Sequence, residues 1–217
     1  ESTMISRRQF VLAAAVAPFA SSAVAAPQTF VAGKNYLNVY PPAPTPSGKI
    51  EVVLFFAYTC PHCLQFDPFF RAWRKTVPSD VTVRICPVAW QAQLLPFTQT
   101  YFALEAMGLL DKCSMPFFES VIYQEHVYNY ENPTADIIDF MVKMGVDGKK
   151  FEQTLKSFGV MNKSRVATQT WQAYQIDSTP MLGVGGIFST GPHLVGSREE
   201  TPACVDFLID QIRKTRG

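Results

Sequence analysis

Two cysteines enclose a proline and a histidine in the sequence Cys60-Pro61-His62-Cys63. This C-x-x-C spacing suits a redox-active dithiol, one half of a zinc site or a structural cysteine pair. A tetrahedral zinc site needs two further ligands, and the chain has neither a second C-x-x-C nor two histidines about three to five residues apart. The spacing therefore favours thiol–disulfide chemistry and predicts no metal.

Thiol–disulfide exchange requires a thiolate, and the surroundings of Cys60 are expected to stabilise one. Cys60 would stand at the start of a helix, where unpaired N–H groups and the positive end of the helix dipole favour negative charge. Pro61 suits the first helical position, and His62 can add a positive charge or a hydrogen bond. Cys63 would lie one turn further in, shielded from solvent. A stable thiolate favours the reduced form, so the disulfide would oxidise other thiols.

The motif follows a strand and begins a helix. Residues 50–58 form a nearly unbroken apolar and β-branched run, which is typical of a central strand buried on both faces. Residues 81–88 resemble a second strand, which completes a βαβ unit. Pro68 is expected to kink the helix between them. The apolar residues of that helix recur at helical spacing: Leu64, Phe66, Phe69, Phe70 and Trp73.

A block of helices interrupts the strands. Helical periodicity fills residues 94–175, and a hairpin around Gly185-Gly186 follows it. The fold class is therefore α/β with a helical insertion. The expected divisions are a first part over 26–92, an inserted helical domain over 93–174 and a second part over 175–217. The expected helices cover 97–110, 115–126, 134–144, 148–158, 163–174 and 201–216, and the hairpin strands cover 181–184 and 187–190.

Composition limits the classes of function. The 217 residues carry 19 Lys and Arg against 18 Asp and Glu, and 47% are hydrophobic. Such a chain can bury a full core without metals or disulfides. It has no surplus of positive charge for binding phosphate backbones, so nucleic acid is not an expected partner. The proline-rich segment 41–48 has no packing periodicity and predicts an extended surface loop.

The first residues resemble an export signal. Arg7 and Arg8 precede an apolar run over 10–20, and small residues end at Ala25. The run is too short for a membrane span and is broken by Pro18. We expect residues 1–25 to be a signal peptide cleaved after Ala25, with the general secretory and twin-arginine routes both open. The cysteines then enter an oxidising compartment.

Taken together, the Cys60–Cys63 motif after an apolar strand, the helical insertion and Ser178-Thr179-Pro180 before the Gly-Gly hairpin resemble the DsbA family of thiol:disulfide oxidoreductases. The resemblance extends over residues 30–217. It implies a thioredoxin fold with a helical domain inserted between the βαβ unit and the C-terminal ββα unit. It also implies a cis peptide bond before Pro180, placed so that the backbone of Thr179 pairs with an extended substrate.

The same resemblance implies an activity and partners. A periplasmic enzyme of this kind donates its Cys60–Cys63 disulfide to reduced exported proteins through a mixed disulfide at Cys60. A membrane quinone reductase resembling DsbB then reoxidises it. The redox-active disulfide would be the only prosthetic group, and the protein would be a monomer.

Two other functions stay open from the sequence. One is a disulfide isomerase or reductase, although isomerases of this group usually add a dimerisation domain and residues 26–49 are too few to build one. The other is a peptide-binding, chaperone-like module without catalysis, in which apolar surface around the dithiol holds unfolded chains. A reduction potential separates the first alternative from an oxidase, and client protection without cysteines identifies the second.

The sequence departs from the family at one buried position. Well-known members carry a glutamate six residues before the first cysteine, where this chain has Leu54. Arg84 is the nearest match to the usual basic partner, and proton transfer at Cys63 would use water, Glu51 or no specific group. The other cysteines are expected to be buried thiols, with a second disulfide among them left open: Cys86, Cys113 and Cys204. His126 and His193 are expected at the surface or at helix caps.

Overall fold

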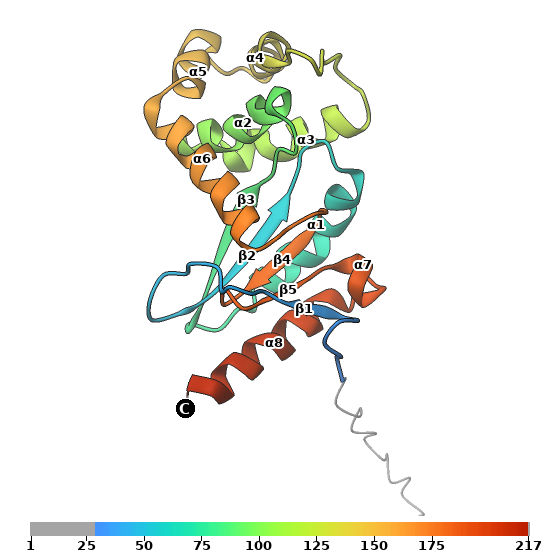
Figure 1. The fold of residues 1–217 in the computed structure, drawn as a ribbon. Coiled ribbons are helices and arrows are strands. Elements are labelled where there is room, and N and C mark those ends of the chain that lie inside the picture. Colours follow the sequence, from blue (N-terminus) through green and yellow to red (C-terminus); the bar gives the residue numbers. More distant parts are fainter. Residues whose placement is uncertain (1–28, 217) are drawn as a thin grey trace, which may run out of the picture.

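The computed structural model describes residues 29–216. The expected signal peptide, residues 1–25, lies outside this range. A mixed sheet forms the centre of the described part, with the strand order β1-β5-β4-β2-β3 (Figure 1). Its strands are β1 (Tyr36–Asn38), β2 (Ile50–Phe56), β3 (Val81–Pro87), β4 (Met181–Val184) and β5 (Phe188–Thr190).

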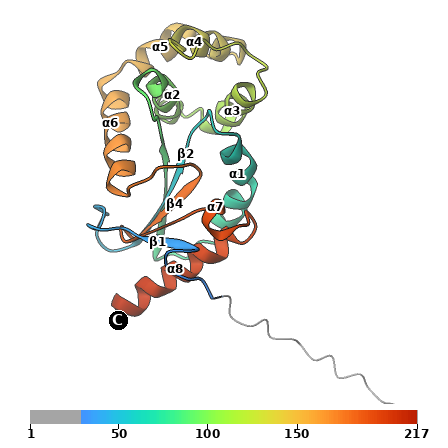
Figure 2. The same cartoon turned by 45° about the vertical axis from the view of Figure 1, so that its right-hand side comes forward.

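The predicted βαβ unit is present. Strands β2 and β3 are parallel, with Ile50 opposite Val81, and helix α1 (Pro61–Arg74) connects them. Every residue of β2 is buried, as its apolar run predicts. The reason is visible in Figure 2, where α1 and α6 (Phe158–Ala173) lie on opposite sides of the sheet. Pro68 lies within α1, which continues through it.

The helical block lies between β3 and β4, beyond one end of the sheet (Figure 1). Helix α6 returns from this block along the sheet and contacts both α2 and β3. After the β4–β5 hairpin come two further helices, and the second of them contacts β4, β5 and α1. The remaining helices are α2 (Leu95–Ala106), α3 (Met115–Ile122), α4 (Thr134–Lys143), α5 (Gly148–Leu155), α7 (Pro192–Val195) and α8 (Thr201–Arg216).

Several helices begin or end at residues other than those expected from the apolar periodicity, because capping residues and turns determine where a helix stops. The helix expected over 148–158 ends at Leu155, since Ser157 caps the next helix by accepting a hydrogen bond from the backbone N–H of Val160. Helix α6 therefore begins at Phe158, five residues before the expected start. The helix expected over 97–110 is α2, which ends at Ala106, and a π-helical turn over Leu110–Ser114 follows. The helix expected to reach residue 126 ends at Ile122.

The proline-rich segment is not wholly at the surface. The backbone N–H of Val39 donates to the carbonyl of Ile187, and that of Ala43 donates to Gly186, both at 2.8 Å. Ala43 is buried as a result. The chain before β2 therefore runs beside the β4–β5 hairpin, with β1 pairing with β5. Strand β1 has only three residues, too few for a periodicity to be recognised in the sequence. The expectation of an extended surface loop over 41–48 was wrong for Ala43, which is buried against the hairpin.

Within residues 29–216, every helix is too short or too polar to cross a bilayer.

Candidate active site

The dithiol lies where the central strand passes into a helix. Strand β2 ends at Phe56, and the backbone N–H of Cys60 donates to the carbonyl of Ala57 at 3.0 Å, which turns the chain. Cys60 is the N-cap residue of α1, with extended backbone, and Pro61 occupies the first helical position, where no N–H is needed. Cys60 is partly exposed, whereas Cys63 is only 4% exposed. Only one of the two sulfurs can therefore meet a protein substrate.

The two thiols have opposite acidities. A hydrogen bond from the Cys63 thiol is the largest of the effects that lower the pKa of Cys60 to about 6, and Thr179 and the backbones of Cys63 and His62 add to it. Burial partly opposes this decrease. Burial raises the pKa of Cys63 far above that of an ordinary thiol, and the neighbouring Cys60 raises it further. At neutral pH the pair is therefore a thiolate at Cys60 beside a neutral thiol at Cys63.

A proline loop from the distant part of the chain completes the site. The peptide bond between Thr179 and Pro180 is cis. The Sγ atom of Cys60 lies 3.3 Å from the carbonyl oxygen of Thr179. The loop immediately precedes β4, which pairs with β2 in the sheet, so strand pairing fixes its position beside the start of α1.

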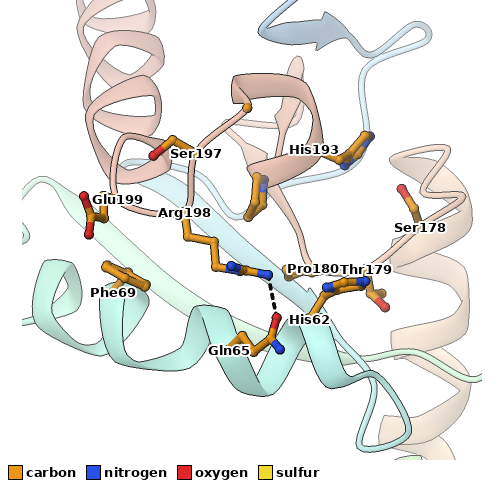
Figure 3. Close-up of a pocket in the computed structure, with 12 residues that line it drawn as sticks. His62, Gln65, Phe69, Ser178, Thr179, Pro180, His193, Ser197, Arg198 and Glu199 are labelled. Atoms are coloured by element: carbon orange, nitrogen blue, oxygen red, sulfur yellow. Dashed lines mark hydrogen bonds between the residues drawn. The ribbon is translucent and has the colours of Figure 1, made fainter.

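An open groove lies next to the dithiol and is bordered by His62 of the motif and by the proline loop. It has a volume of about 740 Å³, and α1 contributes His62, Gln65 and Phe69 to one wall (Figure 3). The opposite wall comes from α7 and the loop after it, where Arg198 donates a hydrogen bond to Gln65 across the groove. The remaining lining residues are Ser178, Thr179, Pro180, Pro192, His193, Gly196, Ser197 and Glu199.

Comparisons with known proteins agree on one family. No family model matches the chain. The thiol:disulfide interchange protein DsbA of Bordetella parapertussis is 36% identical over 203 residues, which cover 92% of this chain and 95% of the relative. The DsbA of Burkholderia cepacia is 33% identical over 196 residues, covering 89% and 91%. The chain belongs to the DsbA family.

The crystal structure of Pseudomonas aeruginosa DsbA shows the same fold as this DsbA-family chain. Its TM-score is 0.78 at 31% identity, and the match covers 86% of this chain and 96% of the other. The expected fold, a thioredoxin fold with an inserted helical domain, is confirmed. The chain is a protein disulfide oxidoreductase.

This DsbA-family chain has no carboxylate on β2 that faces Cys63. Leu54 is 7% exposed and lines the same cavity as Cys63. Side chains alternate along a strand, so Glu51 points to the other face, where the ring of Phe55 packs against Tyr174 at the end of α6. Glu51 is bound there by Arg84, with Nε to Oε1 at 2.8 Å and Nη2 to Oε2 at 3.0 Å. The structure therefore separates Glu51 from the dithiol.

The remaining cysteines of this DsbA-family chain are buried free thiols. Cys86 donates to the carbonyl of Ala167, and burial raises its pKa to about 12. Cys204 lies 3.5 Å from the hydroxyl of Thr190, and burial raises its pKa as well. Burial also raises the pKa of Cys113. Low thiolate content makes all three poor nucleophiles.

The two other histidines differ from each other. His193 is exposed on α7, as expected, and borders the groove. His126 is partly buried against the rings of Tyr128 and Phe140, and its Nε2 lies 3.7 Å from Oδ2 of Asp139. The spacing of residues in the sequence did not reveal Asp139 as an acidic partner of His126. The two side chains meet only because the loop before α4 folds back toward that helix. Among residues 29–216, no cluster of His, Cys, Asp and Glu is arranged to hold a metal ion.

Proposed function

We propose that this DsbA-family chain is a dithiol oxidase that donates its Cys60–Cys63 disulfide to reduced exported proteins. The observation that carries the proposal is the contrast between the two thiols, a pKa of about 6 for the partly exposed Cys60 and a strongly raised pKa for the buried Cys63. A stabilised thiolate makes the reduced form more stable relative to the disulfide. The disulfide therefore tends to accept electrons from substrate thiols.

The reaction proceeds through a mixed disulfide at Cys60. A substrate thiolate attacks Sγ of Cys60, the Cys60–Cys63 bond breaks, and its electron pair passes to Cys63, which takes up a proton. A second substrate thiolate attacks the substrate sulfur bound to Cys60, and Cys60 leaves as a thiolate. The substrate loses two electrons and forms its disulfide, while the enzyme gains two. A low pKa makes Cys60 a good leaving group in this second step.

We assign the neighbouring residues to two roles. Pro61 and His62 tune the acidity of Cys60, since they begin the helix whose backbone N–H groups lie beside its sulfur. Thr179 and Pro180 hold the substrate, because an extended peptide laid in the groove passes beside the backbone of Thr179. The site and its groove are complete within one chain, which supports a monomer as the active unit.

Reoxidation and location follow from the family and the chain's first residues. We propose that a membrane quinone reductase resembling DsbB takes the two electrons from the reduced dithiol. The arginine pair and apolar run within residues 4–26 support export to the periplasm, where reduced substrates arrive unfolded. We expect such a partner to approach Cys60 over the same groove as a substrate segment.

The test is oxidation of a reduced two-cysteine peptide by the disulfide form. We expect rapid oxidation by the parent protein, none by Cys60→Ala, and unchanged oxidation by the matched control Cys86→Ala, whose sulfur is buried away from the groove. Equilibration with glutathione gives the reduction potential, which we expect well above the value of about −270 mV typical of thioredoxin. Undiminished activity of Cys60→Ala, or a potential close to that of thioredoxin, would contradict the proposal.

A further inference from the structure

A second cavity lies beside Cys63, and Pro180 borders both this cavity and the substrate groove. It has a volume of about 430 Å³, and Cys63 and Leu54 form part of its wall. Its other walls come from α1, from the π-helical turn over Leu110–Ser114 and from Tyr101 of α2. Cys63 therefore lines a space that Leu54 and several polar side chains also border.

Asp67 is the carboxylate that α1 contributes to this cavity. It follows Cys63 by four residues, which places both side chains on the same face of the helix, one turn apart. The Oδ2 atom of Asp67 is buried, and Nε of Arg71 lies 2.7 Å from it in an ion pair whose alignment falls short of a hydrogen bond. A buried carboxylate oxygen with an open hydrogen-bonding position is suited to exchange a proton with its surroundings.

The charged groups around Asp67 act in opposite directions. Burial is the largest effect and raises the pKa of Asp67, while the neighbouring Arg71 guanidinium lowers it; the net change is upward. Arg74 of the same helix, Asp111 and Ser114 of the π-helical turn, and Tyr101 of α2 are the other polar groups facing the cavity. Burial raises the pKa of Tyr101 to about 12, so its hydroxyl stays protonated at neutral pH.

We propose that Asp67, acting through water in this cavity, exchanges a proton with Cys63. The inference rests on the proposed oxidase function. When the substrate thiolate opens the disulfide, the electron pair left on Cys63 Sγ accepts a proton from water, and that water is reprotonated by the Asp67 carboxylic acid, which becomes a carboxylate. Asp67 then regains its proton from bulk solvent through its exposed edge, since its side chain is 22% exposed.

Water is a suitable carrier in this place. A bridging water needs room and two to four polar partners. The carboxyl of Asp67, the thiol of Cys63 and the hydroxyl of Ser114, which also hydrogen-bonds with Tyr58, all belong to residues that line this cavity. Leu54 cannot take part, because its side chain has neither donor nor acceptor. Glu51 cannot exchange a proton with Cys63 either, because Arg84 binds the carboxylate of Glu51 on the other face of the sheet.

The test follows the rate at which the oxidised protein reacts with a peptide thiol, at a series of pH values. Each rate constant is divided by the thiolate fraction of the peptide, so that only groups of the enzyme remain. Neither Cys60 nor Cys63 titrates in the disulfide form. We expect the corrected rate to fall as pH rises through the pKa of Asp67, and the Asp67→Asn variant to lose this step and react on the order of tenfold more slowly at the acidic end.

Two further variants separate proton transfer from a structural role. Arg71→Gln removes the cation that lowers the pKa of Asp67, so the step should move to higher pH; Arg71 is 60% exposed, so this variant is expected to fold. Leu54→Glu combined with Asp67→Asn should restore a pH-dependent step, since it places a carboxyl in the same cavity. Asp111→Asn is the matched control, a carboxyl lining the cavity from the other wall, and should keep the parent profile.

The outcomes distinguish this inference from the proposed function. A parent protein that fails to oxidise the peptide at any pH contradicts the oxidase itself. A parent protein that oxidises the peptide, with an Asp67→Asn profile that retains the step or an Arg71→Gln step that does not move, leaves the oxidase intact and overturns the role of Asp67. A step lost in Asp111→Asn but kept in Asp67→Asn overturns it equally.

Discussion

The Sγ atom of Cys60 lies 3.3 Å from the carbonyl oxygen of Thr179, although 119 residues separate the two in the chain. The contact exists because β2 leads into Cys60 and its antiparallel neighbour β4 follows Pro180. The helical block is inserted between these strands without disturbing their pairing. The environment of the reactive sulfur is therefore determined by the sheet and by the first turn of α1 together.

Removing the thiol of Cys63 should make Cys60 less acidic. The hydrogen bond from Cys63 is the largest effect that lowers the pKa of Cys60 to about 6, so Cys63→Ala should raise this pKa. Cys63→Ser keeps a hydroxyl donor and should show a smaller increase. The measurement is the ultraviolet absorbance of the thiolate against pH in the reduced protein, with Cys60→Ala as the blank. Equal titration midpoints in the parent protein, Cys63→Ala and Cys63→Ser would show that the start of the helix alone sets the pKa of Cys60.

The reduced form should gain stability over the oxidised form as pH rises from about 6 to about 8.5. The pKa of Cys60 is about 6 in the folded protein and ~8.5 in an unfolded chain, so its stabilising contribution is complete above ~8.5 and is lost as pH falls through 6. Above ~8.5 the trend should reverse, because Cys63 ionises only when unfolded. Urea unfolding with and without a reducing agent measures the difference in free energy of unfolding between the two forms. The three other cysteines are thiols in both forms, so their contributions cancel in this difference.

Arg84→Ala should destabilise the fold without changing the dithiol. Glu51 is 5% exposed in its side chain, and removal of Arg84 leaves its carboxylate buried without a partner. Such a loss typically costs ~3 kcal/mol. The pKa of Cys60 should stay the same, because the pair lies on the opposite face of the sheet. The double variant Glu51→Gln, Arg84→Met should recover most of the stability. A changed pKa of Cys60 in Arg84→Ala would contradict the separation of the two faces.

Gly183→Ala should destabilise the protein by about 1–3 kcal/mol through overpacking. A Cβ atom at this position of β4 would collide with the ring of Tyr174. That ring cannot move freely, since it packs against Phe55 and its hydroxyl accepts the backbone N–H of Gly186. The control is Gly159→Ala in α6, where a Cβ meets no atom within 4 Å and alanine is the better helix former. Urea unfolding of both variants should give changes of opposite sign.

Sequence reasoning found the features that are local in the chain. The buried strand β2 was recognised by its apolar run, and the helix that begins at Pro61 by its motif and spacing. Helix ends were less well predicted, because Ser157 divides two helices within one continuous apolar pattern. Strand β1 was missed, since its pairing with β5 depends on a contact between residues such as Tyr36 and Thr190, far apart in the sequence.

The two cysteines of the candidate site were predicted from the sequence, but the residues that line the groove on α7 and its loop were not. Cys60 and Cys63 carry a recognisable spacing, whereas Arg198 reaches the groove only because α7 and its loop pack beside α1. Asp67 had a signal that was available, its four-residue spacing from Cys63 on one helix face. The spacing points to a function only once the structure shows that both residues line one cavity, and a sequence pattern cannot reveal a cavity.

The pairing of early strands with late ones also governs how this chain folds as it is made. Strand β2 needs β4, and β1 needs β5, so a growing chain that ends after α6 lacks two of the strands that complete its sheet. Contacts between distant parts of a chain are also slow to form. Such a partial chain already contains Cys60 and Cys63, but it lacks Thr179, whose carbonyl oxygen lies beside the sulfur of Cys60 in the folded protein. The native environment of Cys60 is therefore established only after synthesis of the Thr179–Pro180 loop and of β4, which pairs with β2.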